Sequence, residues 1–280
     1  AGPRSQSGRR SDGVPVDCTR DDERDHVAHM TLDFGRLNLF SPDAIAELRR
    51  VGDLVPDDVS VLTVSSGYPA EDGAETADDV PGLSAGLDLT AAKDLSADEA
   101  RPVIRDLHAA IAGIRDCDAV TVCGCGSYAF GAGLELAMAC DVRVATADAA
   151  LGLPEVDVGL VTGIQGGLLV RLVGLAAAKE LIYTGEPVSG AVAADLGLVN
   201  EAVPPGEYDA AVDRWVDRLA AKSPHVLRRQ KAVFRGWRSE GLERGVEESV
   251  AAIADCFDTH DQAEAMAAFL EGREPNFTGQ

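Results

Sequence analysis

The chain has 280 residues, of which 46% are hydrophobic, so it can bury a substantial core and is not a disordered protein. Asp and Glu number 47 against 25 Lys and Arg, and the formal net charge of −22 argues against nucleic acid or an anionic membrane as a partner. No apolar run is long enough to cross a bilayer, and the polar, basic first residues do not resemble a secretory signal. We therefore expect a cytoplasmic protein.

The basic residues include few lysines, at positions 93, 179, 222 and 231. At about 1 M salt the Debye length falls to roughly 3 Å, so crowded acidic groups then repel one another little. An acidic, lysine-poor surface is therefore interpreted as adaptation to the salt-loaded cytoplasm of a halophile. An ordinary acidic protein is the alternative.

The six cysteines do not form a recognisable disulfide or metal framework. Cys123 and Cys125 lie one residue apart in an apolar segment, so a strand would place both on the same face. Structural zinc sites use wider spacing and a second pair of ligands. We expect buried thiols in a reducing compartment, and no metal site.

The first third of the chain predicts a tail, two strands and a long loop. Residues 1–24 are rich in Arg, Ser, Gly and Asp, and we expect a disordered tail there. Apolar alternation from His26 predicts the first strand, and residues 59–64 predict the second. Between them, the Ser-Pro-Asp sequence at 41–43 has the order of cap, proline and acidic first turn that opens a helix. The glycine-rich, acidic stretch 66–82 predicts an unusually long surface loop.

The rest of the chain alternates strands and helices before becoming mainly helical. A helix is predicted around 97–114, with Leu107, Ile111 and Ile114 on one face. The further elements are strands at 119–125 and 142–145, helices that include 135–140, 176–183 and 191, and a helical region from about 206. This alternation predicts an α/β fold. The glycines at 131–133 lack the third glycine of a dinucleotide fingerprint and the acidic residue that should follow it, so a nucleotide-binding fold is excluded.

Three glycine-marked segments are the candidates for chemistry. They are LSAGLDL (83–89), YAFGAGLELAMACD (128–141) and LGLPEVDVGLVTGIQGG (151–167). The second predicts a tight turn into a buried helix, whose first N–H groups lack intrahelical partners and favour negative charge. An N–H group at the Ser-Ala-Gly turn of the first segment could converge on the same point. Two such donors aimed at one oxygen would form an oxyanion hole.

Two acidic residues lie in these segments. Glu135 falls in the first turn of the predicted apolar helix, and Glu155 follows Pro154 in another apolar stretch. Taken alone, Glu135 is explained equally well as a complement to the helix dipole. Taken alone, Glu155 is more often a solvated turn residue.

The order and spacing of these segments resemble the enoyl-CoA hydratase/isomerase (crotonase) family. SAGLDL is similar to the family's S-A-G-x-D-L, YAFGAGLELAMACD to its Y-A-x-G-G-G-x-E-L-A-x-x-C-D, and GLPEVDVGL to its G-x-P-E-x-x-x-G-L. RLVG (171–174), YTGEPVSGAVAADLGLVNEAVP (183–204) and AFLEGREPNF (268–277) also fit. The resemblance extends from about residue 26 to the end.

The resemblance implies an α/β fold of the crotonase (ClpP-like) type, a spiral of repeated ββα units with a C-terminal helical region. On this basis we expect the spiral core over 25–205. We expect a helical trimerisation region over 206–280, and a homotrimer or homohexamer. No cofactor is implied, because coenzyme A is part of the substrate.

The resemblance also implies the reaction and its residues. Both glutamates that the family's hydratases use are present as Glu135 and Glu155, which favours an enoyl-CoA hydratase over relatives with other chemistry. The oxyanion donors fall on the backbone N–H groups of Leu87 and Ala132. Glu155 is expected to protonate the α carbon, while Glu135 orients the attacking water and helps to deprotonate it. Because two carboxyls around one water cannot easily both be ionised, one should have a raised pKa.

Substrate and coenzyme A contacts are carried over onto eight positions: Ala85, Leu87, Asp88, Leu89, Thr90, Ala132, Lys231 and Phe277. Further cations that could meet the coenzyme A phosphates are Lys93, Arg228, Arg229 and Arg273. Solvated helix faces explain most of these cations equally well.

Five positions depart from the family's pattern. Ala132 replaces the middle glycine of G-G-G, Leu87 is bulkier than the usual residue, Gly126-Ser127 replaces Asn-Gly, and Thr162 replaces a common proline. These changes leave the identity of the acyl substrate open. The alternatives are another crotonase reaction, such as enoyl-CoA isomerisation, or a non-catalytic acyl-CoA-binding scaffold.

Overall fold

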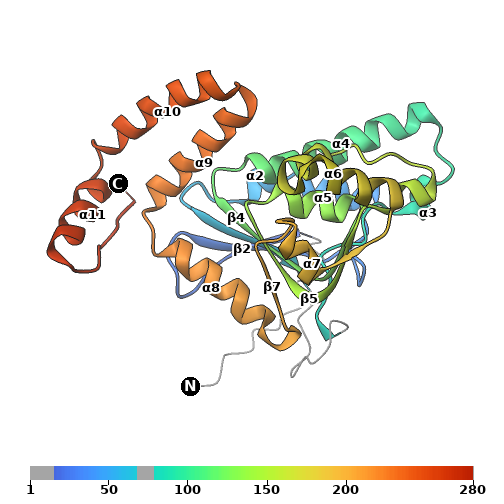
Figure 1. Cartoon of the computed structure of the whole chain (residues 1–280), viewed down its shortest axis with the longest axis horizontal. Helices are drawn as coiled ribbons and strands as arrows, with labels where there is room; N and C mark the ends of the chain where they lie inside the picture. The colour runs from blue at the N-terminus through green and yellow to red at the C-terminus, as the bar shows by residue number, and fades with distance from the viewer. Residues whose placement is uncertain (1–15, 68–78, 280) are drawn as a thin grey trace.

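A mixed seven-stranded sheet forms the centre of the molecule (Figure 1). The computed structural model describes residues 16–67 and 79–279. The strands are β1 (Val16–Arg20), β2 (Val27–Leu32), β3 (Val61–Ser66), β4 (Val120–Phe130), β5 (Val142–Gly152), β6 (Val188–Ser189) and β7 (Glu201–Val203). Their order is β1-β2-β3-β4-β5-β6, and β7 also pairs with β5. The strands from β2 to β5 are parallel, and β1 and β6 run antiparallel to their neighbours.

Helices cover both faces of this sheet. Those of the core are α1 (Pro42–Leu48), α2 (Val51–Leu54), α3 (Leu89–Ala92), α4 (Ala97–Asp116), α5 (Ala132–Ala139), α6 (Gly167–Thr184) and α7 (Gly190–Asp195). Figure 1 shows α4, α5 and α6 on one side of the sheet and α8 (Tyr208–Ala220) on the other. On the α8 side, Val216 packs in one cluster with Val27, Val61 and Val122. The short 3-10 helices η2 (Pro154–Val158) and η3 (Pro205–Glu207) complete the core.

The amphipathic helix α4 shows how the sequence encodes this packing. Ser96 and Glu99 form a capping box, in which each side chain bonds to the other residue's backbone N–H group. Leu107, Ile111 and Ile114 recur at helical spacing and are fully buried, as predicted. The capped N-terminus and the buried face therefore fix where α4 begins and which side meets the core.

Three N-terminal and central elements differ from the sequence prediction. Residues 16–24 were expected to belong to a disordered tail, but Val16–Arg20 pairs along the edge of β2 as β1. The rest of that tail, and most of the long loop expected at 66–82, lie outside the described residues. Strands β4 and β5 each run to 11 residues, because glycines allow the register shifts that carry their pairing past Gly124 and Gly126.

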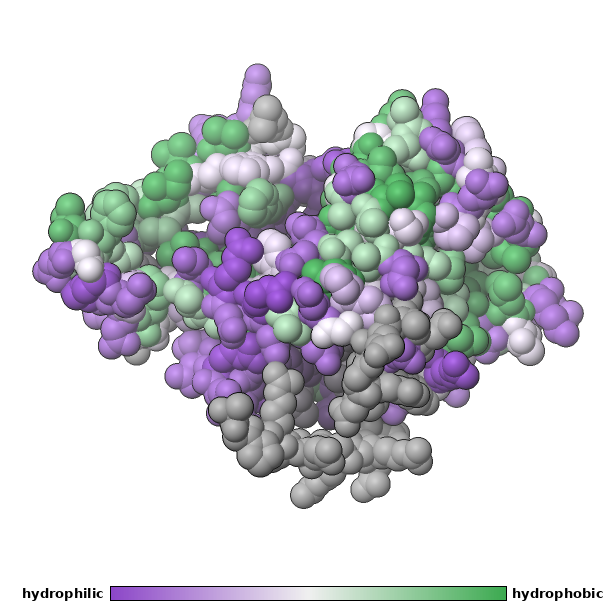
Figure 2. Space-filling view, turned by 60° about the horizontal axis from the view of Figure 1, so that its bottom comes forward, coloured by the Kyte–Doolittle hydropathy of each residue, from purple (hydrophilic) through white to green (hydrophobic). Residues whose placement is uncertain are grey.

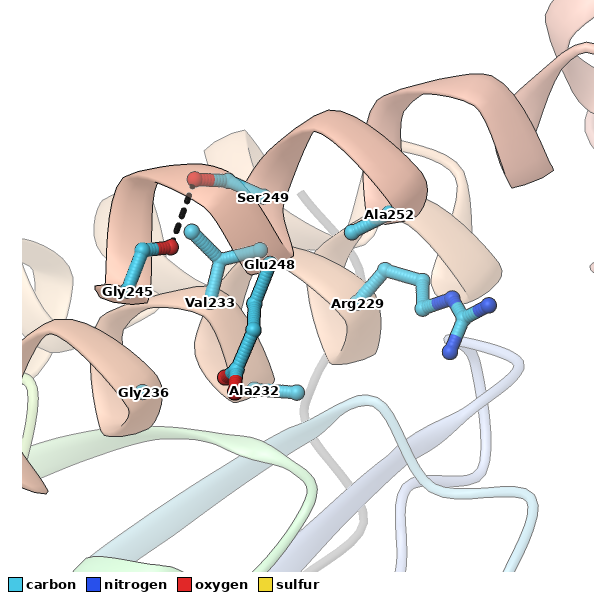
Figure 3. A pocket seen from close by; sticks show the side chains of 8 residues that line it. All are labelled: Arg229, Ala232, Val233, Gly236, Gly245, Glu248, Ser249 and Ala252. Carbon is cyan, nitrogen blue, oxygen red and sulfur yellow. Dashed lines mark hydrogen bonds between the residues drawn. The ribbon is translucent and has the colours of Figure 1, made fainter. Parts of the chain in front are cut away.

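The region from Tyr208 onward is helical, as expected. It continues from α8 into α9 (Pro224–Ser239), α10 (Leu242–Cys256) and α11 (His260–Glu271). We call these last three helices the arm: α9 contacts the sheet at β4, and α10 and α11 stand away from it (Figure 1). Between α9 and α10 lies a hollow that Arg229, Val233 and Gly236 line from one helix and Glu248 and Ala252 from the other (Figure 3).

The arm exposes apolar side chains rather than burying them. Phe269 and Leu270 on α11 are 85% and 84% exposed, and hydrophobic surface gathers over these helices in Figure 2. The other exposed large apolar residues of the arm are Val226, Phe234, Trp237, Val246, Val250, Ile253, Phe257 and Met266. No helix within 16–67 or 79–279 is both long and apolar enough to span a bilayer.

Candidate active site

The turn between β4 and α5 is the centre of the site. Gly131 caps α5 with φ +52°, a backbone conformation that side chains with a Cβ atom rarely adopt. Its N–H group donates to the Gly152 carbonyl on β5 at 3.0 Å, and the Phe130 N–H group donates to the Ser84 carbonyl at 3.0 Å. The start of α5 is therefore fastened both to β5 and to the segment before α3.

The 84–87 segment runs beside the start of α5 at very short range. Ser84 forms a parallel bridge with Ala129, and a Cβ atom on Gly133 would lie 2.4 Å from the Ser84 carbonyl oxygen. Gly86 has φ +90°, and a Cβ atom on it would lie 2.8 Å from the Phe130 oxygen. The same atom would lie 3.3 Å from the amide nitrogen of Ala132. Glycine is required at these positions because the two backbones nearly touch.

This close approach brings the Leu87 amide beside that of Ala132. In the bridge between Phe40 and Leu87, the Gly86 carbonyl and the Asp88 N–H group bond to Phe40, so the Leu87 N–H group points the other way. Ala132 is the first residue of α5, where an N–H group has no intrahelical partner. Within the described residues, neither N–H group donates a backbone hydrogen bond. The two predicted oxyanion donors therefore lie together.

Glu135 is buried beneath this turn. It is 1% exposed, and its Oε1 accepts a hydrogen bond of 2.8 Å from the Gln165 N–H group. Burial raises the pKa of Glu135 to about 7, and the negative charge of Glu155 adds to the increase. The backbone N–H groups of Gln165, Gly166 and Ile164 oppose it. At neutral pH this carboxyl can therefore both hold and release a proton, as expected of one member of the pair.

Glu155 reaches the same turn from the other side. It lies in the first turn of η2 and is partly buried. The Thr162 hydroxyl donates to its Oε2 at 2.9 Å, and a Cβ atom on Gly131 would lie 3.3 Å from its Oε1. One oxygen of Glu155 therefore lies over the residue that precedes the Ala132 amide.

The 162–166 loop connects the two carboxyls. A Cβ atom on Gly166 would lie 2.5 Å from the Thr162 methyl carbon and 3.2 Å from Glu135 Oε1. The loop is held from α4, where Arg115 donates to the Gln165 side chain at 2.7 Å and His108 bonds the Ile164 carbonyl at 2.9 Å. Sequence reasoning missed Gln165, Arg115 and His108. It singled out Thr162 only as a departure from the family's proline.

The predicted substrate contacts divide into two groups. Ala85 lies in the 84–87 segment, and Asp88 caps α3 by accepting bonds from the amides of Thr90 and Ala91, so positions 85–90 lie next to the oxyanion donors. Leu89, in the first turn of α3, is 46% exposed.

Lys231 and Phe277 lie elsewhere in the chain. The Lys231 ammonium is buried, 2.8 Å from Asp141 and 2.6 Å from the Ala119 carbonyl oxygen. These partners precede β5 and β4, whereas Ala132 follows the other end of β4. Phe277 lies in the partly buried C-terminal segment after α11. The structure does not bring these two residues to the carboxyls of the same chain.

The further candidate cations also have protein partners. Lys93 lies 4.0 Å from Asp94, and Arg228 donates to the Asp58 carbonyl. Arg229 pairs with Asp255, and Arg273 pairs with Glu264 and Glu271. These contacts favour the interpretation of the arginines as parts of charged helix surfaces.

Taken together, two neighbouring amides and two carboxyls are groups that can stabilise a developing oxyanion and move protons beside it. A family model described as enoyl-CoA hydratase/isomerase matches residues 80–280. The chain is 33% identical over 247 residues to a crotonyl-CoA hydratase of Syntrophomonas wolfei, with 86% of this chain and 90% of that protein covered. It is 29% identical over 240 residues to a short-chain-enoyl-CoA hydratase of Clostridium acetobutylicum, with 85% and 88% covered.

Solved structures share the architecture. Pseudomonas aeruginosa DspI superposes with a TM-score of 0.83 at 30% identity, over 98% of this chain and 100% of that one. An enoyl-CoA hydratase from Bacillus anthracis superposes with a TM-score of 0.83 at 25% identity, over 95% and 100%. The expected fold class, a crotonase-type α/β core followed by C-terminal helices, is confirmed.

Proposed function

The chain belongs to the enoyl-CoA hydratase/isomerase (crotonase) family, and from this premise we propose that it is an enoyl-CoA hydratase. The reaction adds water across the 2,3 double bond of a trans-2-enoyl-CoA and gives a 3-hydroxyacyl-CoA. One observation carries the proposal. Glu135 and Glu155 both border the 162–166 loop, and Glu155 Oε1 lies over Gly131, next to the Ala132 amide.

The two amides act on the thioester. Its carbonyl oxygen accepts hydrogen bonds from the N–H groups of Leu87 and Ala132, which stabilise the enolate that develops as water attacks. Each such donor is worth roughly 10²–10³ in rate. The dipole of α5 adds to this stabilisation, because Ala132 is the first residue of that helix.

The two carboxyls share one water and one transferable proton. Glu135 takes a proton from the water as the oxygen attacks the β carbon, and Glu155 delivers a proton to the α carbon. Burial favours the proton on Glu135 in the unliganded chain. The proposed roles therefore require that this proton pass to Glu155 through the shared water before the water attacks.

Crotonyl-CoA is the substrate that tests the proposal. The absorbance of its conjugated thioester should disappear, and the product should be heavier by one water. A wild-type protein that instead moves the double bond of a 3-enoyl-CoA into conjugation, without hydrating it, would be an isomerase. Tight binding of coenzyme A thioesters with no turnover of any enoyl-CoA would favour a non-catalytic acyl-CoA-binding scaffold.

Assembly into trimers or hexamers is part of the proposal. The apolar side chains of the arm, such as Phe257, Phe269 and Leu270, are exposed in a single chain, and contact with further copies would bury them. Sedimentation equilibrium should give a mass of three or six chains. A monomer at micromolar concentration would contradict the assembly.

The acidic surface is proposed to suit high salt. With a formal charge of −22, the chain repels the phosphates of coenzyme A, and salt screens that repulsion. The KM for an enoyl-CoA should therefore fall as KCl rises from low to molar concentration. A KM that climbs steadily with salt would contradict this.

A further inference from the structure

Thr162 is a residue of the site to which neither the family's pattern nor the two-glutamate mechanism gives a role. It stands where a proline is common in the family, and proline has no hydroxyl group. Here the Thr162 hydroxyl donates to Glu155 Oε2 at 2.9 Å. Thr162 is partly buried, so water competes for this bond less than it would on an open surface.

The direction of this bond distinguishes the two oxygens of Glu155. Oε2 accepts the Thr162 proton and so has one lone pair engaged, which favours Oε1 as the oxygen that carries the carboxyl's own proton. Oε1 is the oxygen that lies over Gly131, beside the first amide of α5. The hydroxyl thus fixes both the rotation of the carboxyl and the oxygen that can exchange a proton near the oxyanion donors.

The other branch of Thr162 holds its side chain in place. A Cβ atom on Gly166 would lie 2.5 Å from the Thr162 methyl carbon, so this methyl group packs directly on the loop backbone that adjoins Glu135. The Gln165 amide of the same loop donates to Glu135. One rigid loop therefore contacts both carboxyls, and Thr162 is its contact with Glu155.

We propose that Thr162 is a positioning residue that keeps Oε2 of Glu155 occupied and thereby directs proton exchange to Oε1. The inference rests on the proposed hydratase function. It assigns Thr162 no contact with the substrate: the residue acts through Glu155. Proton transfer in which Glu155 gives its Oε1 proton to the α carbon leaves a carboxylate whose Oε2 still accepts from Thr162.

Two substitutions separate the hydroxyl from the shape of the side chain. Thr162→Val keeps the branched shape and the methyl contact with Gly166 but removes the donor. Thr162→Ser keeps the donor and removes the methyl group. Loss of one such hydrogen bond should lower the kcat of Thr162→Val roughly tenfold while KM stays within about twofold. Thr162→Ser should recover most of the lost kcat.

The opposite result in turnover would overturn the inference. A Thr162→Val enzyme with wild-type kcat would show that the hydroxyl is idle. If Thr162→Ser were as impaired as Thr162→Val, packing rather than hydrogen bonding would be the role of Thr162. A fall in kcat together with a large rise in KM would indicate general damage to the site.

Crystal structures of the wild type and the two variants test the inference without relying on any reaction. Glu155 should keep one orientation in the wild type and in Thr162→Ser, and should rotate or occupy several orientations in Thr162→Val. An unchanged Glu155 in Thr162→Val would overturn the positioning role. If the wild type hydrates no enoyl thioester, the proposed function fails, and these structures still decide whether Thr162 positions Glu155.

Discussion

Helix α5 and the C-terminal arm both carry apolar side chains, but α5 buries them and the arm exposes them. All eight residues of α5 are buried, including Glu135. In α10 and α11, by contrast, Val250, Ile253, Phe269 and Leu270 are more than half exposed. Helix α5 finds its partners in β4, β5 and the 84–87 segment of its own chain. One chain is therefore sufficient to assemble the carboxyls and amides, whereas a single chain leaves the apolar surface of the arm exposed.

Among the tests of this contrast, the loss of either carboxyl should have the largest effect on turnover. Glu135→Gln and Glu155→Gln should each lower the turnover of crotonyl-CoA by about 10²–10⁴, because each removes a group that moves a proton. Circular dichroism should remain that of the wild type. The exposed Glu186→Gln is the matched control and should keep full activity. Near-normal turnover in either site variant would remove that carboxyl from the mechanism.

The tight packing of the loop predicts a second effect. In Gly166→Ala the new methyl group would lie 2.5 Å from the Thr162 methyl carbon and 3.2 Å from Glu135 Oε1. Both side chains must therefore shift away from residue 166. A displacement of about 1 Å in an active site can lower kcat roughly 10²-fold. Gly167→Ala is the control, because a Cβ atom at Gly167 has open space around it. Equal kinetics for the two alanine variants would mean that the loop tolerates displacement.

The burial of Glu135 predicts a pH-dependent stability. Its pKa is raised from 4.5 to about 7, so the folded chain binds this proton more tightly than the unfolded chain does. The cost of ionising Glu135 is absent below its unfolded pKa of 4.5, grows as pH rises, and is complete above about pH 7. Glu135→Gln removes that cost. The variant should therefore exceed the wild type in unfolding free energy by up to about 3 kcal/mol near pH 8.

Urea titrations of both proteins across this pH range give the difference directly. Groups far from Glu135 titrate equally in the two proteins, so the pH-dependent difference in unfolding free energy reports on the surroundings of Glu135. The excess stability of Glu135→Gln should vanish toward acidic pH. A difference that does not change with pH would contradict the assigned burial.

The smallest effect on the folded core is expected from the arm. Compared as single chains, Phe269→Glu combined with Leu270→Glu should change the unfolding free energy by no more than about 0.5 kcal/mol, because both side chains are exposed in one chain. The mass in solution should nevertheless fall to that of one chain. Val192→Glu, a partly exposed apolar position on α7, should leave the assembly intact. An unchanged mass in the double variant would mean that the arm has no role in assembly.

Local patterns made much of the fold predictable. The periodicity of Leu107, Ile111 and Ile114 gave the buried face of α4, and the Ser-Pro-Asp sequence at 41–43 gave the start of α1. Strand β1 was missed because its sequence, VDCTR, is short and has only Val16 and Cys18 as apolar residues beside two charged ones. It forms because the edge of β2 offers hydrogen bonds, which is information that resides in another segment of the chain.

The candidate site was predictable in its residue types but not in its connections. The ordered motifs identified Glu135, Glu155, Leu87 and Ala132, since each sits at a fixed offset within a glycine-marked segment. The contacts between Thr162 and Glu155, and between Gln165 and Glu135, depend on how the 162–166 loop folds back over α5. No local periodicity encodes such a contact.

A crystal structure with acetoacetyl-CoA, a 3-oxo thioester that has no double bond to hydrate, tests the central geometry most directly. The thioester oxygen should lie within hydrogen-bond distance of the Leu87 and Ala132 nitrogens, and the carboxyls of Glu135 and Glu155 should face the β and α carbons of the acyl chain. A thioester bound away from these amides, or carboxyls of Glu135 and Glu155 that face different spaces, would contradict the account.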